Sequence, residues 1–166
     1  MTSNSEPFPA AEPTLLVGHG RDPSSDHALA VAVDVARRLG ARLQVVHAIC
    51  VDDYPMNLDY PDWEDQGAAA VAEERRHVAR LLAESPVPWT YEALHGEPAA
   101  VLSRAATEHD ALMIVVGSRG EGLRRALTRL VDPSVSHGVI GRGHRPVLVV
   151  PLPHPPVAEA HAALAG

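Results

Sequence analysis

The chain has little of what would indicate a disulfide-bonded, membrane-spanning or nucleic-acid-binding protein. Cys50 is the only cysteine, so no intrachain disulfide can form, and a reducing compartment fits. No apolar run approaches the ~18 residues of a transmembrane helix, and the N-terminus lacks a basic segment followed by an apolar one. The formal net charge of −7 argues against nucleic acid or an anionic membrane as a partner, since both require a basic face. We therefore expect a cytoplasmic protein.

Aromatic residues are also scarce, at 4% of the chain, whereas hydrophobic residues of all kinds reach 46%. Ala, Val and Leu predominate, which suits helices packed on a buried parallel sheet better than an aromatic-rich β-sandwich. Residues 1–13 are polar, contain three prolines and are expected to be disordered. Residues 152–166 form a tail of unassigned role that prolines separate from the core. We expect a single domain over residues 14–151.

Short apolar runs alternate with amphipathic segments along this domain. The segment 51–66 holds two prolines and six acidic residues without a steady period, which predicts a surface loop. The alternation implies right-handed crossovers and a doubly wound α/β protein, in which helices cover both faces of a parallel sheet. Strands are expected at 15–18, 43–49, 89–94, 112–116 and 146–150. Helices are expected at 26–39 and 67–84, and two more are expected, one that begins at Glu97 and one that passes through Val135.

Two glycine-containing loops directly follow apolar strands and form the candidate binding site. The first contains Gly18 and Gly20, and the second begins with Gly117, Arg119 and Gly120. In an open α/β sheet, ligands collect beyond the carboxyl ends of the strands, where the winding direction reverses. Glycines let backbone N–H groups approach phosphate oxygens, and six arginines make the second loop and the segment behind it locally basic. The pattern favours an anion, but it also fits glycines that serve tight turns and arginines on a solvated face.

The order of these pieces resembles the universal stress protein family from about Leu15 to Pro151. The resemblance implies a five-stranded sheet in the order 3-2-1-4-5, with the two glycine loops side by side at the switch point. The stretches that carry it are Pro23-Ser24-Ser25, Gly96-Glu97-Pro98-Ala99, Ile114-Val115-Val116-Gly117-Ser118-Arg119-Gly120, Ser134-Val135-Ser136 and Arg145-Pro146-Val147-Leu148-Val149-Val150-Pro151.

The resemblance also implies a ligand and a partner for the chain. The ligand is ATP or another adenine nucleotide, and the partner is a second copy of the chain that pairs antiparallel with the last strand. The implied homodimer contacts are Val147, Leu148, Val149 and Val150. The implied nucleotide-binding residues are Gly18, Gly20, Gly117, Arg119, Gly120, Ser134 and Val135.

The sequence departs from the family's ATP-binding pattern at two points. Nucleotide-binding members carry G-x2-G-x9-G-[ST] after the fourth strand, whereas here Ser134 arrives three residues late and Pro133, which lacks an N–H, holds the glycine position. Gly20 stands where these members have an Asp that contacts the nucleotide. Each lost contact weakens binding by about 1–3 kcal/mol, which predicts a weak or altered nucleotide site. The alternative is a dimeric interaction module that has lost nucleotide binding.

No pattern typical of an enzyme or a metal centre stands out. The chain has no Gly-x-Ser-x-Gly elbow, Walker loop or dinucleotide-binding G-x-G-x-x-G. Ten histidines are scattered without a His-x-x-x-His pair or a Cys/His cluster at ligand spacing, so we expect no zinc site. His47, within an apolar strand, is predicted to be a buried histidine with a hydrogen-bond partner rather than a base. The resemblance thus implies a non-enzymatic stress-response protein, with slow nucleotide hydrolysis left open.

Overall fold

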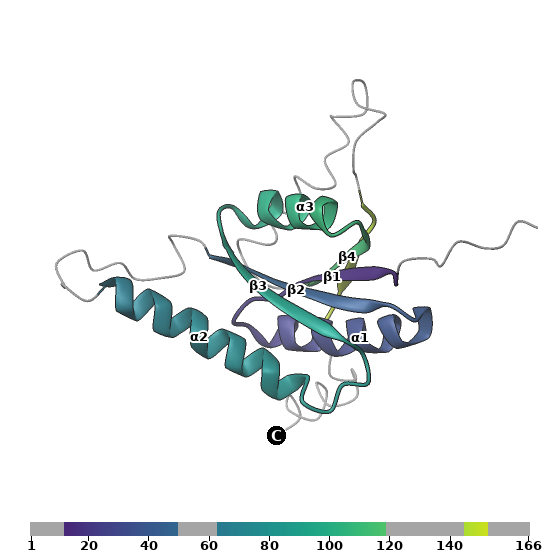
Figure 1. Cartoon of the computed structure of the whole chain (residues 1–166), viewed down its shortest axis with the longest axis horizontal. Helices are drawn as coiled ribbons and strands as arrows, with labels where there is room; N and C mark the ends of the chain where they lie inside the picture. The colour runs from purple at the N-terminus through teal and green to yellow at the C-terminus, as the bar shows by residue number, and fades with distance from the viewer. Residues whose placement is uncertain (1–11, 50–62, 119–144, 153–166) are drawn as a thin grey trace, which may run out of the picture.

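The computed structural model describes residues 12–49, 63–118 and 145–152, which form a layered α/β domain (Figure 1). The strands form one parallel five-stranded sheet in the order β3-β2-β1-β4-β5. This confirms the predicted fold class and strand order. The elements are β1 (Thr14–Gly18), α1 (Pro23–Leu39), β2 (Arg42–Ile49), α2 (Trp63–Leu81), β3 (Trp89–His95), α3 (Pro98–Glu108), β4 (Ala111–Gly117) and β5 (Val147–Val150).

Helices α1 and α2 cover one face of the sheet, and α3 covers the other (Figure 1). Successive side chains of a strand point to opposite faces, so β1 contributes to both cores. Leu15 and Val17 pack with α1 and α2, whereas Leu16 packs with α3, and all three side chains are fully buried. Full burial of such a side chain stabilises the fold by about 1.5–3 kcal/mol. The central strand is therefore held from both sides.

Helix α1 begins at Pro23 rather than at the predicted Asp26, because Asp22 caps it. The Asp22 side chain accepts a hydrogen bond from the backbone N–H of Ser24 at 2.9 Å. Pro23 fits the first helical position, where its missing N–H is not needed. The helix ends at Gly40, which adopts a left-handed conformation with φ of 61° and donates its N–H to the Ala36 carbonyl.

Helix α2 covers residues 63–81, so its first residues are helical and do not belong to the predicted 51–66 loop. The sequence-based start at Gly67 was wrong because a helix tolerates an isolated glycine. The β3 and β4 predictions are confirmed to within two residues at each end, and so is the predicted start of α3. Glu97 caps α3 by accepting from the Ala100 N–H at 3.1 Å. No helix among the described residues is long and apolar enough to cross a membrane. Of the segment 1–13 that was predicted to be disordered, residues 1–11 lie outside the described residues. The rest of the predicted 51–66 loop, the predicted helix through Val135 and nearly all of the 152–166 tail also lie outside them.

Candidate functional site

The carboxyl ends of β1 and β4 lie side by side, as the switch-point prediction requires. Gly18 at the end of β1 pairs in register with Val116, the residue before Gly117 in β4. From this pair of strands the sheet extends through β2 on one side and β5 on the other. Ligands of doubly wound sheets bind at such an edge. We call it the β1–β4 edge.

Of the predicted nucleotide-binding residues, the structure brings the three glycines Gly18, Gly20 and Gly117 to the β1–β4 edge. The turn that starts helix α1 contacts two of them, because Gly20 lies against Asp22 and Ser25 while Gly117 lies against Ser24. The other predicted residues, Arg119, Gly120, Ser134 and Val135, lie outside the described residues, as does Pro133.

Packing alone accounts for the glycines at positions 18 and 117. A Cβ atom on Gly117 would lie 2.6 Å from the carbonyl oxygen of Ser24, and one on Gly18 would lie 2.8 Å from Cδ1 of Leu102. Both distances are shorter than the 3.0 Å below which real Cβ contacts essentially do not occur. Glycine at these positions lets β4 approach the start of α1 and β1 approach α3. Close packing is thus a reason for glycine at both positions besides the tight turns that the sequence suggested.

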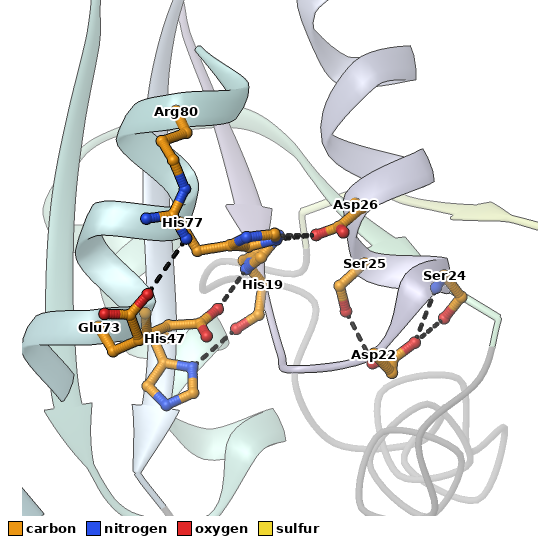
Figure 2. Close-up of polar contacts among 10 residues, drawn as sticks. His19, Asp22, Ser24, Ser25, Asp26, His47, Glu73, His77 and Arg80 are labelled. Carbon is orange, nitrogen blue, oxygen red and sulfur yellow. Dashed lines mark hydrogen bonds and ion pairs between the residues drawn. The ribbon is translucent and has the colours of Figure 1, made fainter. Parts of the chain in front are cut away.

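The Asp22 carboxylate occupies the N-terminus of helix α1 (Figure 2). Its Oδ1 accepts hydrogen bonds from the backbone N–H and the hydroxyl of Ser24, and its Oδ2 accepts from the Ser25 hydroxyl at 2.9 Å. Helix N-termini attract anions, so this side chain takes the place that a phosphate would take on α1.

A second group of polar side chains, which the sequence did not indicate, surrounds His19 just after β1. The His19 side chain is 0% exposed. Its Nε2 lies 3.0 Å from Oδ1 of Asp26 on α1, and its Nδ1 lies 2.7 Å from Oε1 of Glu74 on α2. Nε2 of His77, also on α2, lies 2.9 Å from the same Asp26 oxygen (Figure 2). We call these four residues the histidine cluster.

Hydrogen bonds to its backbone hold His19 at the start of its loop. Its N–H donates to the Val46 carbonyl in β2 at 2.9 Å. Its own carbonyl lies 3.0 Å from Nδ1 of His47, which must carry the proton because a carbonyl only accepts. His47 is 4% exposed, so the prediction of a buried histidine with a hydrogen-bond partner is confirmed. Strand β2 therefore fixes the backbone from which the His19 ring extends.

An open depression of about 370 Å³ adjoins the histidine cluster on helix α2. His77 connects the two, since its half-exposed side chain belongs to the cluster and lines the depression. A hydrogen bond from Arg80 holds the pKa of the Glu73 carboxyl below its ordinary value. The lining residues are Arg21, Ala70, Glu73, Glu74, His77 and Arg80.

The cluster was missed because its members are far apart along the chain: 55 residues separate His19 from Glu74. One signal was available in the helix pattern. Glu74 falls on the stripe of α2 that includes Val71 and Val78, and it is buried at 5% exposure. A carboxylate on the apolar stripe of a helix needs a polar partner, so this position of Glu74 predicts one.

The fold and the β1–β4 edge define a doubly wound α/β protein with a candidate ligand site at its switch point. The sequence profile of the Universal stress protein family matches residues 13–151. A relative from Thermus aquaticus, named "Universal stress protein in QAH/OAS sulfhydrylase 3'region", is 33% identical over 138 residues, which cover 82% of this chain and 97% of the relative. The chain therefore belongs to the universal stress protein family, and membership makes it a stress-response protein.

Solved structures agree with this assignment. UspA from Lactobacillus plantarum superposes with a TM-score of 0.61 at 21% identity, over 86% of this chain and 99% of that protein. A universal stress protein in complex with cAMP superposes with a TM-score of 0.56 at 26% identity, over 85% of this chain and 98% of that protein. Both likenesses support the fold.

Proposed function

We propose that this stress-response protein is cytoplasmic, is not an enzyme, and binds an adenine nucleotide weakly at the β1–β4 edge. The observation that supports the proposal is that β1 and β4 end side by side, at Gly18 and Gly117, where the two predicted loops begin. The related universal stress protein in complex with cAMP supports an adenine nucleotide as the ligand class. Weak binding is expected because Gly20 lacks the family's Asp side chain and because the Asp22 carboxylate already occupies the N-terminus of α1.

Calorimetric titration with cAMP, AMP, ADP and ATP tests this proposal. We expect saturable binding of at least one nucleotide, with a Kd between about 10 µM and 1 mM. Arg119→Ala should weaken binding about tenfold or more, since a hydrogen bond to a charged group contributes about 1.5–3 kcal/mol. Arg104→Ala is the matched control, because Arg104 is an exposed α3 residue paired with Glu108.

Two results would contradict the nucleotide proposal. One is the absence of binding heat with all four nucleotides, and the other is equal affinity in the Arg119→Ala and Arg104→Ala variants. Multiple-turnover product formation that Arg119→Ala abolishes would contradict the non-enzymatic part alone.

A second proposed function is that of a homodimeric interaction module that pairs through β5. The observation that favours it is the apolar character of this edge strand, where Leu148 is 36% and Val149 is 41% exposed. β5 ends the sheet and pairs with β4 on one side, so its other side presents backbone groups that a second copy of the strand can bind. Such isologous contacts give closed dimers.

Light scattering on the purified protein distinguishes a dimer from a monomer. Val149→Lys should shift the population toward monomer, because a charge on an edge strand opposes edge-to-edge pairing. Leu112→Lys is the matched control, since Leu112 is 45% exposed but lies on the inner strand β4. A monomeric wild type, or equal effects of the two variants, would count against pairing through β5.

A further inference from the structure

The contacts of His19 require one more positive charge than a neutral imidazole ring supplies. Glu74 Oε1 lies 2.7 Å from one ring nitrogen, and Asp26 Oδ1 lies 3.0 Å from the other. A neutral imidazole carries a proton on only one nitrogen, so the other would direct its lone pair at a carboxylate. Inside the protein, such an unpaired contact is costly. Either a further proton or a cation must therefore lie between the ring and a carboxylate.

Glu74 determines which ring nitrogen keeps its proton. Its contact with Nδ1 is the shorter of the two, and its side chain is only 6% exposed, compared with 37% for Asp26. We therefore place the proton on Nδ1, where it is donated to Glu74. The lone pair of Nε2 then points toward Asp26 and His77. A carboxylate that accepts from the far ring nitrogen is the arrangement that usually accompanies a metal-bound histidine.

The distances among the remaining three groups suit a metal ion. One ligand atom from each of His19, Asp26 and His77 lies within 4.8 Å of the other two. The two histidine Nε2 atoms lie 3.0 Å and 2.9 Å from the same Asp26 oxygen. A tetrahedral Zn²⁺ with ligands at about 2.0–2.2 Å separates its ligand atoms by about 3.3–3.6 Å, so each nitrogen has to move a few tenths of an ångström away from the Asp26 oxygen and the two nitrogens have to reach the same separation from one another. The half-exposed Asp26 and His77 have room for such shifts.

We propose that His19, Asp26 and His77 bind a divalent transition-metal ion, of which Zn²⁺ is the representative case, and that Glu74 orients His19. Two imidazole nitrogens and one carboxylate oxygen favour Zn²⁺ and its neighbours over Mg²⁺ or Ca²⁺, which prefer oxygen ligands throughout. The Asp26 and Glu74 carboxylates balance the two positive charges of the ion. A metal here satisfies the unpaired His19 nitrogen without an additional proton.

Three protein ligands leave one position of a tetrahedral ion to an exchangeable ligand. His77 and Glu74 also line the open depression on α2, so water or a small anion can reach the ion from that side. The site contains none of the residues predicted to bind nucleotide. Metal binding in the absence of nucleotide therefore tests this proposal separately from the nucleotide proposal.

The test uses untagged full-length protein that has been treated with a chelator. Zn²⁺ binding is measured by calorimetry, and Co²⁺ binding by the visible absorption bands of a four-coordinate ion. We expect one equivalent of either metal. His77→Ala and Asp26→Asn should each lower Zn²⁺ affinity by at least about 100-fold, and Glu74→Gln by about 10–100-fold, the usual effect of losing an orienting partner.

His109→Ala is the matched control for nonspecific binding by surface histidines. His109 resembles His77 in exposure, at 32% against 35%, and its Nε2 also contacts a carboxylate, Glu92, at 3.2 Å. This variant should bind Zn²⁺ as the wild type does.

Circular dichroism and thermal melting without metal will show whether each variant is folded. The proposal is wrong if the wild type binds neither metal stoichiometrically, or if His77→Ala and Asp26→Asn bind as tightly as His109→Ala. Either result would mean that a proton holds the cluster together.

Discussion

Replacement of Gly117 by alanine tests the close packing of β4 against the start of α1. The new Cβ atom would lie 2.6 Å from both the carbonyl oxygen and the Oγ of Ser24, and 2.7 Å from its carbonyl carbon. Ordinary contact begins at 3.4 Å, and two of these three atoms belong to the backbone. A side-chain rotation of Ser24 therefore cannot relieve the clash. Either the end of β4 or the first turn of α1 has to move.

Two costs add in this variant. Overpacking of a well-packed site costs about 1–3 kcal/mol. Movement of the first turn also disturbs the Asp22 cap, and the loss of a helix cap costs about 0.5–2 kcal/mol. We therefore expect Gly117→Ala to lower the free energy of unfolding by about 1.5–5 kcal/mol. For a chain of this length, that corresponds to a fall in Tm of about 3–20 °C.

Urea denaturation followed by circular dichroism measures this change, and Gly67→Ala provides the matched control. Among the described residues, no atom outside the adjacent backbone of helix α2 and the two chain neighbours lies within 4 Å of the position of a Cβ on Gly67. The same substitution there should raise the free energy of unfolding by about 0.5–1 kcal/mol, because alanine is the better helix former. If Gly117→Ala stays within about 0.5 kcal/mol of the wild type, the reasoning about this close approach is wrong.

Two further predictions concern polar groups near the site. Asp22→Ala removes an acceptor that serves one N–H and two hydroxyls, so it should lower the free energy of unfolding in urea by about 1–2 kcal/mol. Asp22→Asn retains a capping oxygen and should lower this free energy by less. The hydrogen bond from Arg80 lowers the pKa of Glu73. The ionised Glu73 carboxylate therefore stabilises the fold above its unfolded-state pKa, and this stabilisation is lost as pH falls through its folded-state pKa. Glu73→Gln should therefore lower Tm slightly at neutral pH and leave it unchanged in strong acid; an equal loss at both pH values would contradict this assignment.

The layers could be predicted because the apolar runs are short and nearly continuous, whereas the strand order followed from the family resemblance alone. Leu15, Leu16 and Val17 point alternately to the two faces, and such a run is stable only when both faces are covered. The helix boundaries were predicted less well, because side-chain geometry sets them. The start of α1 depends on which backbone group Asp22 caps, which the hydrophobic period does not report.

The place of the candidate site was predictable, but the roles of its residues were not. The carboxyl ends of parallel strands meet at one edge, so the two glycine loops had to lie close together. That Gly117 faces the backbone of Ser24 depends on how closely α1 approaches the sheet, and no local pattern encodes this distance. The histidine cluster was harder still to predict, because it combines one loop with two separate helices and its ligands have no regular spacing along the chain.

The double burial of β1 also has a consequence for the order in which the molecule opens. Its backbone pairs with β2 on one side and β4 on the other, and its apolar side chains are covered on both faces. Amide protons in such a strand exchange with solvent only when the whole domain unfolds, whereas those at an edge such as β5 exchange through small local openings. His19 follows this strand directly. Local breathing of the sheet edges should therefore leave the ring of His19 in place.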